Sequence, residues 1–120
     1  MQPDPLTPSP DVLLTLALPL ALEEDVLDVL VAHADHAAGF TVLAAEGLGR
    51  HEHLASAMEQ ILGRSRRRMV QVAMARASVQ PLLTALHQAV QNSAMVYWVT
   101  PLLAFGHLGE TPALVLEAAP

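Results

Sequence analysis

The segment from Gly39 to Arg76 constrains the fold of this chain more than any other. Two apolar runs of strand length, Gly39–Glu46 and Met69–Met74, flank a polar arm from Gly47 to Gly63 and an arginine-rich return at 64–68. Five of the six arginines and two of the six histidines lie in this arm or beside it. A long connection inside a small domain is usually functional or disordered. We therefore expect two strands joined by an arm that carries the chemistry.

The composition predicts one domain with a substantial apolar core. The chain has 120 residues, no cysteine and an apolar fraction of 52%, whereas only 3% of its residues are aromatic. A chain of this length can bury a core without covalent staples, and the absence of cysteine excludes disulfides, thiolate metal sites and cysteine catalysis. The apolar fraction is high for a monomer. We therefore expect part of the apolar surface to be buried in a subunit interface.

The charge of the chain argues against nucleic acid as a partner. The formal net charge is −6, and every cationic residue other than histidine is an arginine. Binding to nucleic acid depends on clustered lysine and arginine that neutralise phosphates. We expect no nucleic-acid partner.

The apolar run Val12–Leu22 has about the length of the hydrophobic part of a signal peptide. Asp4 and Asp11 precede it, where a signal peptide carries positive charge, and an acidic cluster at 23–25 follows it. No run reaches the ~18 apolar residues of a membrane span. The sequence therefore predicts a cytoplasmic protein without membrane insertion, whose first strand lies in this run.

Apolar periodicity predicts strands and helices in the order βαββαβ. The strands are expected at Val12–Leu18, Gly39–Glu46, Met69–Met74 (entered through 64–68) and Ala94–Thr100, and the helices from Leu20 to His33 and from an N-cap at Ser78 to near Asn92. Leu102–Leu108 is a candidate for a short extra strand. Residues 1–10 contain four prolines and are expected to form a disordered lead, 11–108 the domain, and 109–120 a flexible tail.

This order predicts an α+β fold of the ferredoxin-like, split β-α-β type, with an antiparallel four-stranded sheet and two helices on one face. The first strand is apolar on both faces, with Leu14 and Leu16 on one side and Leu13 and Ala17 on the other. A sheet with one solvated face alternates more cleanly. Since two helices cover only one face, the other face needs a partner, and a symmetric copy of the chain is the simplest one.

Three stretches of the chain resemble the PII-like (GlnB-like) signalling superfamily. They are Gly47-Leu48-Gly49-Arg50 at the root of the arm, the return Gly63–Arg68, and the strand end Tyr97-Trp98-Val99 followed by Pro101. More narrowly, the chain looks like an uncharacterised branch, a domain of unknown function, often encoded near heavy-metal efflux pumps of the resistance-nodulation-division type. By element order the resemblance covers roughly Val12 to Leu108.

The resemblance implies a homotrimer. In the superfamily the arm is called the T-loop, and ligands bind in clefts between subunits near its base, which would place Gly47, Gly49 and Arg50 at such a cleft. Classical PII proteins hold nucleotide phosphates with a glycine-rich loop after the second helix. Here that connection is Gln91-Asn92-Ser93, without glycine or lysine. We therefore expect nucleotides to bind weakly or not at all.

Arg64, Arg66 and Arg68 alternate along the return, so in a strand they would form a row. Guanidinium groups pair well with phosphate and carboxylate. We therefore add these three arginines to Gly47, Gly49 and Arg50 as the predicted ligand-binding residues at the cleft and arm base. The alternative is a solvated charge run that protects the end of a long strand from edge pairing.

His51 and His53 are the candidate metal ligands of the arm. Residues two apart in extended backbone project to the same side, and imidazole suits Zn²⁺, Ni²⁺ and Cu²⁺. Glu59 lies nearby in sequence and can complete the set. Two ligands from one segment do not fill a tetrahedral site, so further ligands would come from a neighbouring subunit or a partner. The alternative is a pair of solvated histidines.

The other histidines and the hydroxyl residues give no enzyme signature. His33 and His36 are expected at a helix end, where cations stabilise the dipole, and His87 on a helix face, whereas the sequence does not place His107. No serine or threonine has a base and an orienting acid at motif spacing, and there is no P-loop and no H-E-x-x-H. The sequence predicts a protein that is not an enzyme.

We therefore predict a PII-like trimer that senses a ligand at the subunit cleft and signals through the arm at 47–63. The expected context is heavy-metal homeostasis or efflux, with a membrane transport protein as the candidate partner of the arm. One alternative is a metal-binding accessory protein whose arm histidines hold copper, zinc or nickel. The other is a purely structural trimer.

Overall fold

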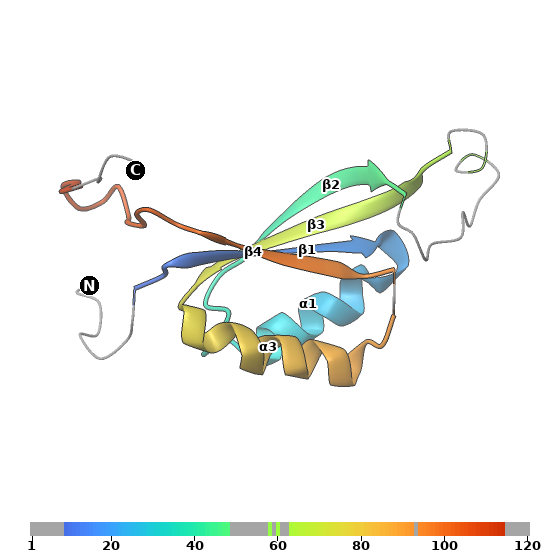
Figure 1. The fold of residues 1–120 in the computed structure, drawn as a ribbon, viewed down its shortest axis with the longest axis horizontal. Coiled ribbons are helices and arrows are strands. Elements are labelled where there is room, and N and C mark those ends of the chain that lie inside the picture. Colours follow the sequence, from blue (N-terminus) through green and yellow to red (C-terminus); the bar gives the residue numbers. More distant parts are fainter. Residues whose placement is uncertain (1–8, 49–57, 59, 61–62, 93, 115–120) are drawn as a thin grey trace.

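The structure is a computed structural model, and it describes residues 9–48, 58, 60, 63–92 and 94–114. The described elements are β1 (Val12–Pro19), a short 3-10 helix η1 (Leu20–Leu22), α1 (Glu23–Ala32), β2 (Thr41–Gly47), β3 (Ser65–Met74), α3 (Arg76–Ala89) and β4 (Val96–Pro101). The strands form one antiparallel sheet in the order β2-β3-β1-β4. Both helices lie on one face of it (Figure 1). The predicted ferredoxin-like βαββαβ fold is confirmed.

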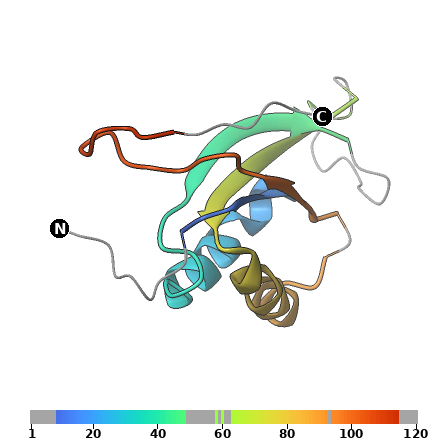
Figure 2. The same ribbon diagram turned by 60° about the vertical axis from the view of Figure 1, so that its left-hand side comes forward.

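The core lies between the sheet and the two helices, which run side by side beneath it (Figure 2). Because successive side chains of a strand point to opposite faces, one set of alternate residues on β1 and β3 faces the helices. The fully or nearly buried members of this core are Val12, Leu14, Leu16 and Leu18 of β1, Val26, Val29 and Leu30 of α1, Val70, Val72 and Met74 of β3, and Leu82 and Leu86 of α3. Each helix therefore buries one apolar face against the sheet.

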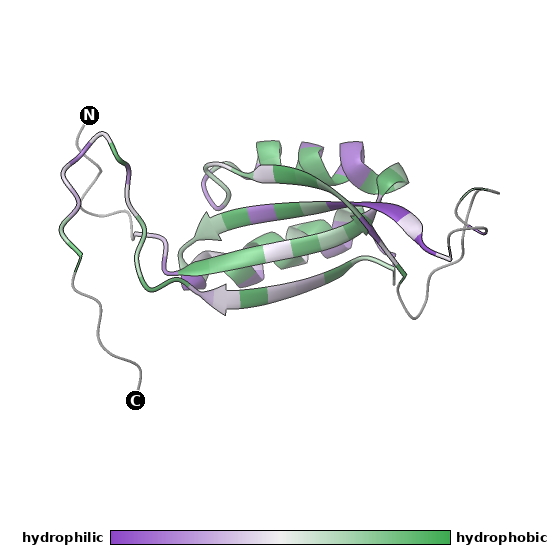
Figure 3. Ribbon diagram, turned by 90° about the horizontal axis from the view of Figure 1, so that it is seen from above, coloured by the Kyte–Doolittle hydropathy of each residue, from purple (hydrophilic) through white to green (hydrophobic). Residues whose placement is uncertain are grey.

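The second face of the sheet is also largely apolar by the strand register. No described element covers most of this face (Figure 3). The register pairs Thr15 with Trp98, Ala17 with Met69, and Leu43 with Met69 on this face. Leu43 is 44% exposed and Trp98 is 42% exposed, whereas the small Thr15 and Ala17 are buried between larger neighbours. The predicted two-sided apolar sheet is thus present, with one side left to solvent in a single chain.

Helix α3 begins at Arg76 with Ala75 as its N-cap residue, so the predicted N-cap at Ser78 is wrong. The carboxylate of Asp11 accepts a hydrogen bond from the backbone N–H of Arg76 at 2.8 Å, and this contact satisfies one of the first amides of the helix. The capping group therefore comes from the start of the sheet, far away in sequence. Pro81 lies inside the helix and not in its first turn, and the helix ends at Ala89, before the predicted end near Asn92.

The predicted extra strand at 102–108 is absent from the described part of the chain. The N–H of Leu102 still donates to the carbonyl of Asp11 at 3.0 Å. Because β4 runs antiparallel to β1, residues after Leu102 would have to pair with residues before Asp11. Strand β1 begins only at Val12 and so offers them no partner. A strand needs a partner edge for its backbone groups. The apolar run therefore leaves the sheet as irregular chain, with Leu103 and Leu108 exposed.

Neither described helix has the length and apolar character needed to cross a membrane.

Leu30 and Val31 are neighbours on α1 that test the assigned core, because Leu30 is fully buried and Val31 is exposed. We expect Leu30→Ala to lower the free energy of unfolding by about 2–5 kcal/mol, since it leaves a cavity between helix and sheet. Val31→Ala should change it by less than about 0.5 kcal/mol. Urea unfolding of both variants measures the difference. Equal losses would show that α1 packs through a different face.

Candidate functional site

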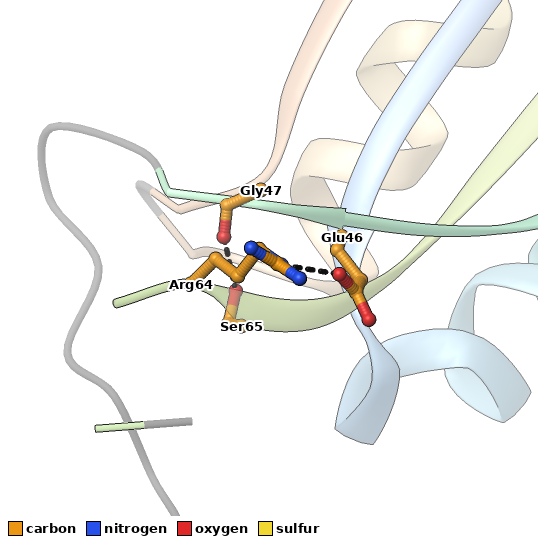
Figure 4. A network of polar contacts seen from close by, with 4 residues as sticks. All are labelled: Glu46, Gly47, Arg64 and Ser65. Atoms are coloured by element: carbon orange, nitrogen blue, oxygen red, sulfur yellow. Dashed lines mark hydrogen bonds and ion pairs between the residues drawn. The ribbon is translucent and has the colours of Figure 1, made fainter. Parts of the chain in front are cut away.

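The root of the arm is formed by the last residues of β2 and the first residues of β3. Gly47 lies opposite Ser65 in the register, and the Ser65 hydroxyl donates to the carbonyl oxygen of Gly47 at 3.0 Å. The Nε of Arg64 donates to the carboxylate of Glu46 in the same network (Figure 4). Gly47, predicted as the first residue of the arm, is thus the last residue of β2. The two strand ends are tied together at the point where the arm begins.

Gly47 also allows a close approach by Arg67. Arg67 is buried although it lies on the open face of the sheet. A Cβ atom at position 47 would lie 3.2 Å from Cδ and 3.3 Å from Nε of Arg67. A side chain at this position would therefore require the Arg67 side chain to shift by a few tenths of an ångström.

Gly63, the residue before the return, has a φ of 70°. This left-handed conformation is costly for residues with a Cβ atom. The chain thus approaches β3 through a glycine that adopts a backbone conformation most other residues avoid.

Arg68 connects β3 to the start of α1. Its Nε donates to the carboxylate of Glu23 at 3.1 Å, and the two side chains are 29% and 27% exposed. Glu23 belongs to the acidic first turn of α1, where negative charge is favoured by the helix dipole. The guanidinium of Arg68 therefore has a structural role between sheet and helix.

The three predicted arginines lie on one side of the sheet but have different surroundings. Arg68 is paired with Glu23 and Arg64 with Glu46, whereas Arg66 is exposed and lies opposite Glu46 in the register. Strand β3 lies between β2 and β1. The pairing of β3 with β1 ends at Arg67, however, so the start of β3 extends beyond β1. The alternative reading, a solvated charge run that protects the end of a long strand from edge pairing, therefore stays a prediction. Arg64 and Arg66 are the exposed members of the row, whereas Arg68 is partly buried.

Several predicted site residues lie outside the described residues. They are Gly49 and Arg50 of the predicted ligand set, and His51, His53 and Glu59 of the predicted metal set. Within the described residues, no three histidine, aspartate or glutamate side chains come together in a group that could hold a metal ion. The metal site in the arm therefore stays a prediction.

The turn between α3 and β4 is closed by its own hydrogen bonds. The Asn92 side-chain carbonyl accepts from the N–H of Ala94 at 2.8 Å, and the Asn92 backbone carbonyl accepts from the N–H of Met95 at 3.1 Å. Phosphate-binding loops work by presenting free backbone N–H groups to the anion. In this turn the amides of Ala94 and Met95 are already in use.

A cavity of about 620 Å³ lies at the opposite end of the sheet from the arm root. Its walls come from the start of β1, the α1–β2 connection, the end of β3 with the start of α3, and the segment after β4. Sequence reasoning did not find this cavity, because no motif joins these segments. It also missed the structural partners Glu23, Glu46, Ser65 and Arg67 at the other end. For Ser65 and Arg67 the sequence did contain a usable signal. These two residues alternate with the three predicted arginines, so in a strand they point to the face opposite the arginine row.

A family model described as "Protein of unknown function (DUF3240)" matches residues 8–109. The chain belongs to this family. A crystal structure of a DUF3240 family protein from Shewanella baltica OS155 is similar to the chain, with a TM-score of 0.66, 22% sequence identity, and coverage of 84% of this chain and 99% of the other. A comparison with curated proteins finds no match.

The second similar structure is CPII, described as a nitrogen regulatory PII-like protein from Thiomonas intermedia K12 bound to ADP, AMP and bicarbonate. It has a TM-score of 0.62, 20% sequence identity, and coverage of 82% of this chain and 97% of CPII. At this identity the similarity shows the fold alone. This DUF3240 chain therefore has a PII-like fold, as the resemblance implied.

The two ion pairs at the arm root should differ in strength. A double-mutant cycle on Glu23 and Arg68 should give a coupling energy of about 1–2 kcal/mol, because both side chains are mostly shielded from water. The cycle on Glu46 and Arg64, whose side chains are 50% and 49% exposed, should give less than about 1 kcal/mol. Urea unfolding of the single and double alanine variants measures both. A larger coupling for the exposed pair would contradict the assigned roles.

Proposed function

We propose that this DUF3240 protein is a non-enzymatic, trimeric PII-like regulator that senses a ligand near the arm root and signals through the arm at 47–63. The observation that carries the proposal is the arm root, where Arg64 bonds to Glu46 and Ser65 bonds to Gly47. The sheet that bears this root has a second apolar face, which is exposed. The proposed context, heavy-metal homeostasis with a membrane transport protein as partner, rests on the resemblance described above.

The exposed face of the sheet supports the proposed assembly. Leu43 of β2, Val96 and Trp98 of β4, and the half-buried Leu13 of β1 and Met69 of β3 lie on this face. Apolar area of this kind gains about 25 cal/mol per Å² when it is removed from water. A closed symmetric assembly of identical chains buries such a face without leaving an open end. A trimer is the state that the PII-like resemblance implies.

The charges at the arm root support an anionic ligand. Arg64 and Arg66 are exposed next to Gly47, and Glu46 pairs with Arg64. An anion with phosphate or carboxylate groups would compete with Glu46 for the guanidinium of Arg64. Together with Gly49 and Arg50, these residues form the proposed ligand set, and Arg68 would support it through Glu23. The arm root joins the end of β2 to the start of β3. Loss of the Glu46–Arg64 pair would therefore alter the structure at the point where the arm leaves the sheet.

The trimer is tested by measuring the mass of the purified chain in solution. Light scattering at micromolar concentration should give about three times the chain mass of 12.8 kDa. Leu43→Asp, on the open face, should shift the protein toward monomer, because it places a charge in the interface. Val31→Asp on α1 is the matched control and should leave the mass unchanged. A wild-type monomer would overturn the proposed assembly together with the cleft between subunits.

Nucleotide binding is expected to be weak. The amides of Ala94 and Met95 are bonded within the turn after α3, so neither of these two groups is free to donate to a phosphate. Calorimetry with ATP and ADP should therefore show dissociation constants above about 100 μM, and Arg64→Ala should weaken any residual binding further. Sub-micromolar affinity for ATP would show that other groups replace the phosphate loop.

A further inference from the structure

The cavity at the far end of the sheet has a size that suits a small molecule. Its volume of about 620 Å³ lies in the usual range for ligand pockets. The segment after β4 leaves the sheet at this end, away from the arm root (Figure 1), and contributes Phe105 and His107 to the walls. No residue of the arm root lines the cavity. The cavity is therefore separate from the ligand site proposed at the arm root, although its wall residue Leu13 lies on the open face that the proposed trimer buries.

Aromatic side chains form two of its walls. The chain contains only two phenylalanines, and both line this cavity: Phe40 precedes β2 and Phe105 follows β4. They remain 37% and 45% exposed, respectively. The rings of Phe105 and His107 pack edge to face, with 5.5 Å between their centroids. A flat aromatic ring is the ligand group that gains most from such surfaces, through burial and through further ring contacts.

The cavity is also lined by polar side chains. Gln71, Ser78, Thr41 and the two histidines provide hydrogen-bonding groups. Nδ1 of His36 is buried and makes no hydrogen bond to any described residue. The His36 side chain is 28% exposed, so other atoms of its ring are the ones that a ligand in the cavity can reach.

The charge around the cavity disfavours anions. Among the described residues that line it, Asp35 is the one carboxylate, and none is a lysine or an arginine. The start of α3 lies beside the cavity, and the positive end of a helix can attract an anion. Here the carboxylate of Asp11 already accepts from the first N–H of that helix. Phosphate and carboxylate groups therefore find no lysine or arginine partner among the described lining residues.

The segment that carries Phe105 is held loosely to the domain. After the bond from Leu102 to Asp11, no backbone hydrogen bond joins residues 103–114 to the sheet or the helices within the described chain. Leu103 and Leu108 on either side of Phe105 are exposed. The contact of this segment with the cavity is therefore made by the side chains of Phe105 and His107.

We propose that this cavity binds a small single-ring aromatic molecule that is neutral or cationic, with Phe105 as its cover. The ring lies against Phe40 and Phe105, and the polar group of the ligand reaches His36 or Asp35. The site discriminates by charge, so a carboxylate or phosphate on the same ring weakens binding.

Three probes that share one ring test the charge rule on the full chain. Benzylamine, benzyl alcohol and benzoate carry a positive, a neutral and a negative group, respectively. We expect saturable binding of the amine and the alcohol, measured by NMR titration, with shifts of the His36 and His107 ring protons. Benzoate should bind at least ten-fold more weakly. Absence of saturable binding by the amine and the alcohol, or benzoate binding as tightly as the amine, would overturn the proposal.

A matched pair of variants tests the cover. Phe105→Ala should weaken benzylamine binding at least ten-fold, because it removes one wall of the site. Leu103→Ala, two residues away in the same segment and outside the cavity, should leave the affinity within two-fold. The mass of each variant is measured by light scattering in parallel. Unchanged affinity in Phe105→Ala would overturn the proposal, as would a changed oligomeric mass, which would identify the cavity as a contact between subunits.

Discussion

The antiparallel pairing of β1 with β3 is the contact on which the rest of the fold depends. Its register runs from Val12 opposite Met74 to Pro19 opposite Arg67. This register directs Leu14, Leu16 and Leu18 toward the helices, and it leaves the outer edges of the pair for β4 and β2. A slip by one residue would turn the leucines to the other face and break the core. The core, the open apolar face and both candidate sites follow from this one pairing.

The two ends of the sheet differ in chemistry. The end that bears the arm holds the paired charges Glu46–Arg64 and Glu23–Arg68. The other end holds the aromatic cavity, with Phe40 and Phe105 and, among the described lining residues, one carboxylate. An anion and an uncharged or cationic aromatic ligand would therefore bind at separate places in one domain. Because β3 runs from one end of the sheet to the other, it contributes Arg68 to the charged end and Gln71 to the cavity. The same strand thus contacts both proposed sites.

Local patterns in the sequence were sufficient to predict the fold class. Alternation of apolar residues predicted the strands, the 3.6-residue spacing of Val26, Val29 and Leu30 predicted the buried face of α1, and the apolar character of both sides of β1 predicted the two-sided sheet. These patterns depend on neighbouring residues, so they can be recognised without knowing the partner element. The arginine row at the arm root was also visible, although its members proved to have different partners. The arm itself, including His51, stays a prediction.

The parts that escaped prediction depend on residues that are distant in sequence. Asp11 caps α3, so that helix begins before Ser78, and Arg68 pairs with Glu23 across 45 positions. The run at 102–108 has the composition of a strand, but it lies beyond the end of β1 and has no partner for its backbone. The cavity exists only where four separate segments meet. The sequence by itself therefore determined which segments become helices and strands and which faces are apolar. The tertiary structure alone decided where elements end, which charges pair and where a ligand fits, because each of these requires two distant segments to be brought within contact distance.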